Sequence, residues 1–197
     1  IQAALASTAF IHHGGGTAES GLWAAATPPE ENSSLADRVE RFIVPYLQKH
    51  PGCTWLELET AVNGELRGLF TPSLGLVGEV LASYAEESDG RWSLRPEDLP
   101  AARRADLEAA AVHLSALGTR LGYTVTRQEG ENRLLLWQEG GQVIHAFHLL
   151  ASALAAGLLR GCAHPPGKCL LVLPGGRGGL LMAKIHRDPA LETAWNR

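Results

Sequence analysis

The chain has 197 residues, of which 45% are hydrophobic and 19% charged, so it is long enough for one domain or two small ones with apolar cores. It holds no stretch of about 20 uncharged apolar residues, which excludes a membrane span, and its three cysteines exclude a disulfide framework and favour a reducing, cytoplasmic setting. Residues 1–100 carry 6 Lys and Arg against 14 Asp and Glu, whereas residues 101–197 carry 11 against 7, so the second half is better suited to contact a polyanion.

Residues 1–33 are predicted to form a tail and linker. The segments "HHGGGTAESG" and "TPPEENSS" are rich in Gly, Pro, Ser and Thr, and they offer little to bury beyond Leu22 and Trp23. The first residue is Ile1, and neither an initiator methionine nor a secretory signal is present. We therefore expect the chain to be a piece of a longer protein.

Residues 34–95 show three short helices followed by a strand. Ser34 precedes the first helix and Thr54 the second, each with an acidic residue three positions later, which is the pattern of a capping box. Thr71-Pro72 opens the third helix, expected to continue through "SLGLVGEVLASYAEE", and "SDGRWSLR" gives a turn and a short strand. This order predicts a winged-helix domain over 34–95.

Residues 96–197 give a different pattern. In chain order they predict a long helix over 96–122, three strands within 123–150, a short helix over 151–159, a buried strand over 168–174, and helical pieces over 179–187 and 189–195. A three-strand meander followed by a crossover indicates a mixed sheet flanked by helices. The predicted fold class is therefore α/β (α+β), with a second domain over 96–197.

The order helix, three strands, helix, strand, helix resembles the core of restriction-endonuclease-like, or PD-(D/E)xK, domains. The segments "LADRVE", "FTPSLGLVGEVLASYAEE" and "RRADLEAAAVHLSALGTRLGY" also resemble the C-terminal region of large bacterial DNA-methylase-type proteins of restriction-modification and phage defence. The resemblance implies a DNA-modification or defence context. It does not imply methyl transfer by this chain, which has no DPPY-like or NPPY-like tetrapeptide and no glycine motif for S-adenosylmethionine.

The acids that the nuclease resemblance implies are missing from their expected strands. Such a nuclease needs an acid at the start of the second core strand and acid-x-Lys on the third, because carboxylates hold the divalent ion. "RLLLWQ" and "QVIHAFHLL" contain no acid, and His148-Leu149-Leu150 stands where the third-strand motif would lie. We therefore predict no catalytic residue and no cofactor. A metal-dependent nuclease that uses Glu108, Glu129 or Glu139 is an alternative.

The stretch "LLVLPGGRGGLLMAK" raises the question of a phosphate-binding loop. It fits neither the Walker nor the dinucleotide pattern, because Lys184 comes more than a helical turn late and has no Ser or Thr beside it. A tight strand-to-helix connection is favoured, and a DNA-backbone contact by Arg177 is the alternative. The predicted DNA-contacting residues are Arg91, Trp92, Arg103, Arg104, Arg177, Lys184 and Arg187.

Two observations weaken DNA contact by the winged-helix domain. Its third predicted helix carries Glu79, Glu86 and Glu87 and no Lys or Arg, whereas base readout favours Arg, Lys, Asn or Gln. For Trp92, a place in the core is favoured over a place at a groove.

The histidines and cysteines predict no metal site. His145 and His148 are three apart on a strand and therefore point to opposite faces. Cys162, His164 and Cys169 lie near a loop and could hold zinc with a fourth ligand, but their spacing matches no Cys-x-x-Cys pattern.

The sequence thus predicts a non-catalytic accessory fragment that positions DNA or mediates assembly with other domains of its parent chain or with partner subunits. The first alternative is a protein-interaction scaffold without DNA contact, which the acidic first half favours. The second alternative is the metal-dependent nuclease.

Overall fold

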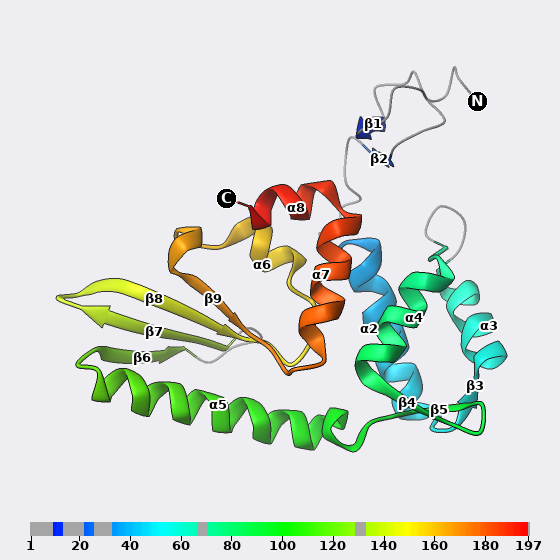
Figure 1. Cartoon of the computed structure of the whole chain (residues 1–197), viewed down its shortest axis with the longest axis horizontal. Coiled ribbons are helices and arrows are strands. Elements are labelled where there is room, and N and C mark those ends of the chain that lie inside the picture. Colours follow the sequence, from blue (N-terminus) through cyan, green and yellow to red (C-terminus); the bar gives the residue numbers. More distant parts are fainter. Residues whose placement is uncertain (1–9, 14–21, 26–32, 67–70, 129–132, 197) are drawn as a thin grey trace. The chain divides into compact units, whose positions relative to one another are not determined.

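The computed structural model describes residues 10–13, 22–25, 33–66, 71–128 and 133–196. Residues 1–33 and residues 34–197 form two separate compact units. In the first unit, β1 (Phe10–His13) pairs with β2 (Leu22–Ala25) in antiparallel fashion, within the region that the sequence predicts as tail and linker. The second unit is a mixed α+β fold, as predicted, and its elements are drawn in Figure 1.

Residues 34–95 form what we term the helical lobe. Its elements are α2 (Leu35–Lys49), β3 (Cys53–Thr54), α3 (Trp55–Glu65), α4 (Leu74–Tyr84), β4 (Ala85–Ser88) and β5 (Arg91–Leu94). The strands form an antiparallel sheet in the order β3-β5-β4. The two-residue turn between β4 and β5 is Asp89-Gly90, with φ of 52° and 73°, the left-handed conformation that type I′ hairpin turns require.

The helix starts follow the predicted caps in part. Thr54 and Glu57 form both arms of the capping box at α3, and the Ser34 hydroxyl accepts a hydrogen bond from the Asp37 amide at α2. The Asp37 carboxylate, however, turns inward to Lys184 instead of completing a box. The third helix begins after Ser73 rather than at Pro72.

The predicted end of the third helix is wrong. Residues 85–88 form strand β4 instead of the last helical turn, because they pair with β5 from Ala85↔Leu94 to Ser88↔Arg91. Helix propensity is a weak preference that pairing with a neighbouring strand readily overrides.

Residues 96–196 form what we term the sheet lobe. Its elements are η2 (Pro96–Asp98), α5 (Pro100–Arg120), β6 (Thr124–Gln128), β7 (Arg133–Glu139), β8 (Gln142–Leu149), α6 (Ala156–Gly161), η3 (Pro166–Lys168), β9 (Cys169–Val172), α7 (Arg177–Arg187) and α8 (Pro189–Trp195). The sheet order is β6-β7-β8-β9, with the first three strands antiparallel and β9 parallel to β8. The predicted mixed sheet is therefore present.

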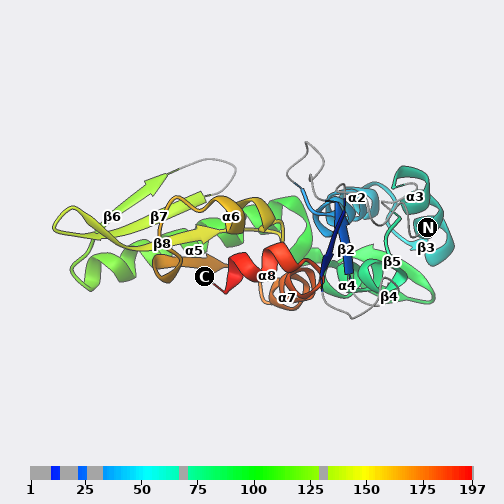
Figure 2. The same ribbon diagram turned by 90° about the horizontal axis from the view of Figure 1, so that it is seen from above.

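Helices cover both faces of this sheet. Figures 1 and 2 show α5 along one face, and α6 over the other with α8 beside it. Leu107, Ala111 and Leu114 of α5 pack against side chains that include Trp137 and Phe147. We term this contact the α5–sheet interface.

Gly118 sets how closely α5 approaches the sheet. A Cβ atom at this position would lie 2.6 Å from Nε1 of Trp137 and 2.8 Å from a methyl group of Val125. Only glycine leaves room for the indole, which stacks on Tyr123 with ring centroids 5.3 Å apart.

One buried apolar cluster spans the two lobes, and a second lies within the sheet lobe. Leu180, Leu181 and Ile185 of α7 lie in the same buried cluster as Val39 and Ile43 of α2, although α7 belongs to the sheet lobe. Residues 34–197 form a single compact unit, and the cluster that α2 and α7 share crosses the predicted boundary between 95 and 96. Within the described ranges, no helix is both long and apolar enough to cross a bilayer.

Candidate functional site

A group of charged side chains is buried where the two lobes meet. Lys184 of α7 donates hydrogen bonds to Asp37 Oδ1 at 2.6 Å, to Glu40 Oε2, and to the Ala153 carbonyl at 3.0 Å. The Lys184 side chain is 1% exposed, and those of its two carboxylate partners are 4% and 2% exposed. The ion pairs therefore tie α2 to α7 without contact with water.

Arg177, at the start of α7, is buried beside this group. Its guanidinium donates to Asp98 and to both the backbone carbonyl and the hydroxyl of Ser83. It also lies over the Tyr84 ring, with its central carbon 3.3 Å from the ring centroid, which is close enough for a cation–π interaction. The Tyr84 hydroxyl in turn donates to Glu40. We term Asp37, Glu40, Tyr84, Asp98, Arg177 and Lys184 the charged seam.

Burial shapes the ionisation of the charged seam. It raises the pKa of Asp37 even though Lys184 opposes the shift, and it raises the pKa of Tyr84, with Glu40 adding to the effect. The phenol therefore stays a hydrogen-bond donor. A cavity of about 310 Å³ borders the seam, and its walls include Glu40, Tyr84 and Asp98.

The seam overturns part of the DNA-contact prediction. Arg177 and Lys184 are each only 1% exposed, so the prediction that they contact phosphate is wrong for this fold. Each is paired with buried carboxylates, Arg177 with Asp98 and Lys184 with Asp37 and Glu40. These ion pairs offset the cost of removing the charges from water.

The other predicted DNA-contact residues lie nearer the surface. Arg103 is mostly buried, with a side chain 16% exposed that pairs with Asp98 and Asp106. Arg91, Arg104 and Arg187 are exposed, and the Arg91 guanidinium donates to the Gly52 carbonyl at 2.9 Å. Trp92 packs partly buried against the core, which is the arrangement favoured for it from the sequence.

The acids proposed for a nuclease lie apart. Glu108 on α5 forms ion pairs with Arg127 and Arg133, Glu139 is exposed at the end of β7, and Glu129 lies outside the described residues. In the part of the chain that the structure describes, the one group of three or more metal-ligating side chains contains no carboxylate.

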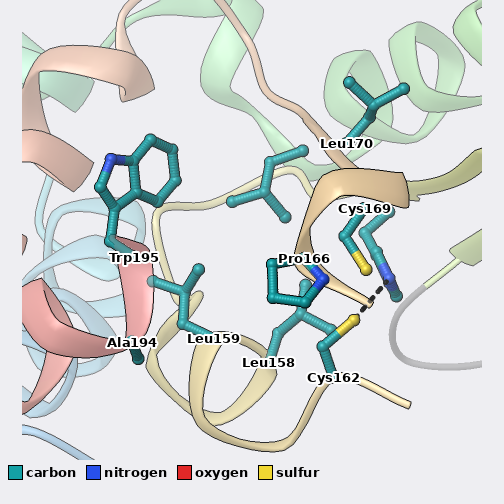
Figure 3. Close-up of a pocket in the computed structure, with 10 residues that line it drawn as sticks. Leu158, Leu159, Cys162, Pro166, Cys169, Leu170, Ala194 and Trp195 are labelled. Atoms are coloured by element: carbon teal, nitrogen blue, oxygen red, sulfur yellow. Dashed lines mark hydrogen bonds between the residues drawn. The ribbon is translucent and has the colours of Figure 1, made fainter. Parts of the chain in front are cut away.

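That group consists of His148, Cys162 and Cys169, which we term the thiol–imidazole cluster. His148 belongs to β8, Cys162 caps the end of α6, and Cys169 begins β9. Nε2 of His148 lies 3.8 Å from Sγ of Cys162, the contact dashed in Figure 3, and the three ligand atoms lie within 4.8 Å of one another. The residue that joins the two cysteines is thus His148, and not the His164 that the sequence suggests.

His164 and His145 have other surroundings. The backbone carbonyl of His164, rather than its ring, meets the Cys169 thiol at 3.4 Å. His145 lies on the opposite face of β8, against the rings of Tyr123 and Trp137, which confirms the predicted parity of the two strand histidines. The alternation of side chains along a strand could have placed His148 on the face of the sheet opposite α5. It could not have shown which residues lie beside His148.

The thiol–imidazole cluster opens onto an apolar cavity of about 400 Å³. Figure 3 shows Leu158, Leu159, Pro166, Leu170 and Trp195 around it, with the two sulfur atoms close together at one side.

Burial governs the ionisation of this cluster as well. Burial and the neighbouring Cys162 raise the pKa of the Cys169 thiol to about 12, while burial and nearby His164 lower the pKa of His148. The Cys169 thiol and the His148 imidazole thus favour their neutral forms. Comparison of this chain with protein-family models, with curated proteins and with solved structures found no match.

Proposed function

We propose that this chain is a non-catalytic accessory module that mediates assembly within a bacterial DNA-modification or defence protein. The observation that carries the proposal is the distribution of charge. Arg177 and Lys184 of α7 are buried in the charged seam, where they pair with carboxylates instead of facing DNA. Four acidic residues are exposed on α4 and the β4–β5 hairpin, namely Glu79, Glu86, Glu87 and Asp89. An acidic surface repels phosphate and suits a basic protein surface on another domain or subunit.

The element order supports the architectural part of the proposal. The order α2, β3, α3, α4, β4, β5, with sheet order β3-β5-β4, agrees with a winged-helix lobe, and α5 to α7 around a mixed sheet agrees with an endonuclease-like lobe. The carboxylates proposed for a nuclease lie apart, and the buried pair Asp37 and Glu40 is neutralised by Lys184, which favours a non-catalytic role. The proposal includes a cytoplasmic setting, which the three free cysteines favour.

DNA positioning is the second candidate, because Arg91, Arg104 and Arg187 are exposed. Each phosphate that an arginine neutralises adds about 0.9 to the slope of affinity against salt concentration on logarithmic axes. A module that positions DNA must therefore lose affinity steeply as salt rises.

Fluorescence anisotropy with a labelled duplex, measured over a range of salt concentrations, separates the two candidates. If the chain is an assembly module, we expect weak binding with a shallow slope that the triple variant Arg91→Ala/Arg104→Ala/Arg187→Ala leaves unchanged. Tight binding whose slope falls by about three in the triple variant would establish DNA positioning and overturn the assembly proposal.

Incubation of the full chain with supercoiled plasmid and Mg²⁺ or Mn²⁺ tests the non-catalytic claim separately. We expect no nicking above that of a metal-free control. Metal-dependent nicking that Glu139→Ala or Glu108→Ala abolishes would show a nuclease instead.

A further inference from the structure

We propose that the thiol–imidazole cluster is a zinc site, in which Nε2 of His148 and the thiolates of Cys162 and Cys169 hold one Zn²⁺ ion. This inference is independent of the proposed function, because it rests on side chains at the other face of the sheet from α5 and needs neither DNA nor a partner protein.

The distances suit a tetrahedral ion. Zn–S bonds of about 2.3 Å and Zn–N bonds of about 2.0–2.1 Å place neighbouring ligand atoms about 3.6–3.8 Å apart. Nε2 of His148 and Sγ of Cys162 are 3.8 Å apart, and Sγ of Cys169 lies within 4.8 Å of both. The ligand atoms therefore lie within about 1 Å of the separations that a tetrahedral zinc ion requires.

The ligand types select a soft or borderline cation. Two thiolates and an imidazole favour Zn²⁺ over Mg²⁺ or Ca²⁺, which require oxygen ligands. His148 is only 5% exposed, and its Nδ1 has no hydrogen-bond partner among the described residues. Its Nε2 contacts the sulfur of Cys162. Among the described residues, no hydrogen-bonded oxygen or nitrogen therefore occupies the imidazole nitrogens in place of a metal.

Binding requires the loss of two thiol protons. The Cys169 thiol donates a hydrogen bond to the His164 carbonyl, with sulfur and oxygen 3.4 Å apart. As the two Zn–S bonds form, the thiol protons of Cys169 and Cys162 pass to water. The products are the zinc-bound dithiolate and two hydrated protons, and no electron is transferred.

The three ligands come from three separate segments. His148 lies on β8, Cys162 at the end of α6 and Cys169 at the start of β9, so an ion would fasten the whole crossover between the two parallel strands to the sheet. A fourth coordination position remains, and the cavity of about 400 Å³ beside the ligands has room for a water molecule there.

Cobalt substitution is the most direct test, because tetrahedral Co²⁺ with thiolate ligands absorbs visibly. The reduced, metal-free full chain should bind one Co²⁺ ion with tetrahedral d–d bands and a thiolate charge-transfer band, and Zn²⁺ should displace it. Cys162→Ser, Cys169→Ser and His148→Ala should each lose the spectrum, whereas Cys53→Ser and His145→Ala should keep it. Zn²⁺ should also raise the Tm of the wild-type chain and leave that of Cys162→Ser unchanged.

The near-isosteric Cys→Ser changes keep the test valid if His148→Ala fails to fold, which circular dichroism will reveal. The proposal is overturned if the reduced, folded wild-type chain gives no tetrahedral cobalt spectrum. It is equally overturned if the spectrum survives in folded Cys162→Ser and Cys169→Ser, or if His164→Ala loses it while folded His148→Ala keeps it. The site is also excluded if Cys162 and Cys169 are found in a disulfide and the chain binds no metal after that disulfide is reduced.

Discussion

The charged seam and the α5–sheet interface join helices to distant elements in opposite ways. In the seam, Lys184 and Arg177 are each 1% exposed and bind carboxylates inside the protein. At the α5–sheet interface the interior is apolar, and the ion pairs of Glu108 lie at its edge, where the Glu108 side chain is 49% exposed. Each buried charge of the seam needs its own counter-charge beside it, so the ion pairs fix one arrangement of the lobes. The α5–sheet interface contributes through apolar contact area, which depends on how well the side chains fit in shape.

Removing the cation of the seam should have the largest effect. Lys184→Met leaves Asp37 and Glu40 buried without a counter-charge, so we expect the free energy of unfolding to fall by about 3–5 kcal/mol in urea denaturation. Arg187→Met, on an exposed part of the same helix, should change it by no more than about 0.5 kcal/mol.

A further variant checks the cause of that loss. Adding Asp37→Asn and Glu40→Gln to Lys184→Met removes the uncompensated charges, so part of the stability should return. Equal stability losses for Lys184→Met and Arg187→Met would mean that the charges of the seam do not hold the lobes together.

A methyl group at Gly118 should disturb the apolar interface to a smaller extent. Gly118→Ala places a carbon 2.6 Å from Nε1 of Trp137, and the indole has little room to move between Tyr123 and Phe147. We expect a loss of about 1–3 kcal/mol in the free energy of unfolding, which exceeds the helix-propensity gain of about 1 kcal/mol. In Gly78→Ala the added carbon meets no described atom within 4 Å beyond its chain neighbours and the nearby backbone of its own helix, so that helical control should gain stability.

The exposed ion pairs at the edge of that interface should matter least, and only in acid. Hydrogen bonding from Arg127, with the charge of Arg133, lowers the pKa of Glu108 below its usual 4.5. Its contribution is thus present above pH 4.5 and disappears as the pH falls through the lowered pKa. Glu108→Gln should reduce the loss of stability between neutral pH and acid, measured by urea denaturation at each pH. In an Arg127→Gln/Arg133→Gln background the same change should have no effect.

The local patterns of the sequence predicted much of the fold. The alternation along β6, the apolar runs of β7 and β8, the Thr54 cap and the Asp89-Gly90 turn are encoded by residues within a few positions of one another, so local patterns and turn chemistry found them. The change from α4 to β4 was missed, because Glu86 and Glu87 favour a helix locally and only their pairing with β5 makes them a strand.

The sites depended on distant partners, which local patterns do not contain. Lys184 looked like a surface cation, because its two carboxylates lie 147 and 144 residues earlier in the chain. Likewise, the spacing of Cys162 and Cys169 indicated only a loop, and their neighbour His148 comes from a strand that the crossover brings beside them.

The place of α7 in the core has a consequence for biosynthesis. Lys184 leaves the ribosome 147 residues after Asp37, which at about 5–20 residues per second is a delay on the order of 10 s. During that time the newly made helices α2 to α4 have neither the apolar side chains of α7 nor the ammonium group that neutralises their buried acids. The helical lobe therefore cannot complete its folding until α7 has left the ribosome, and until then it is exposed to chaperones and proteases.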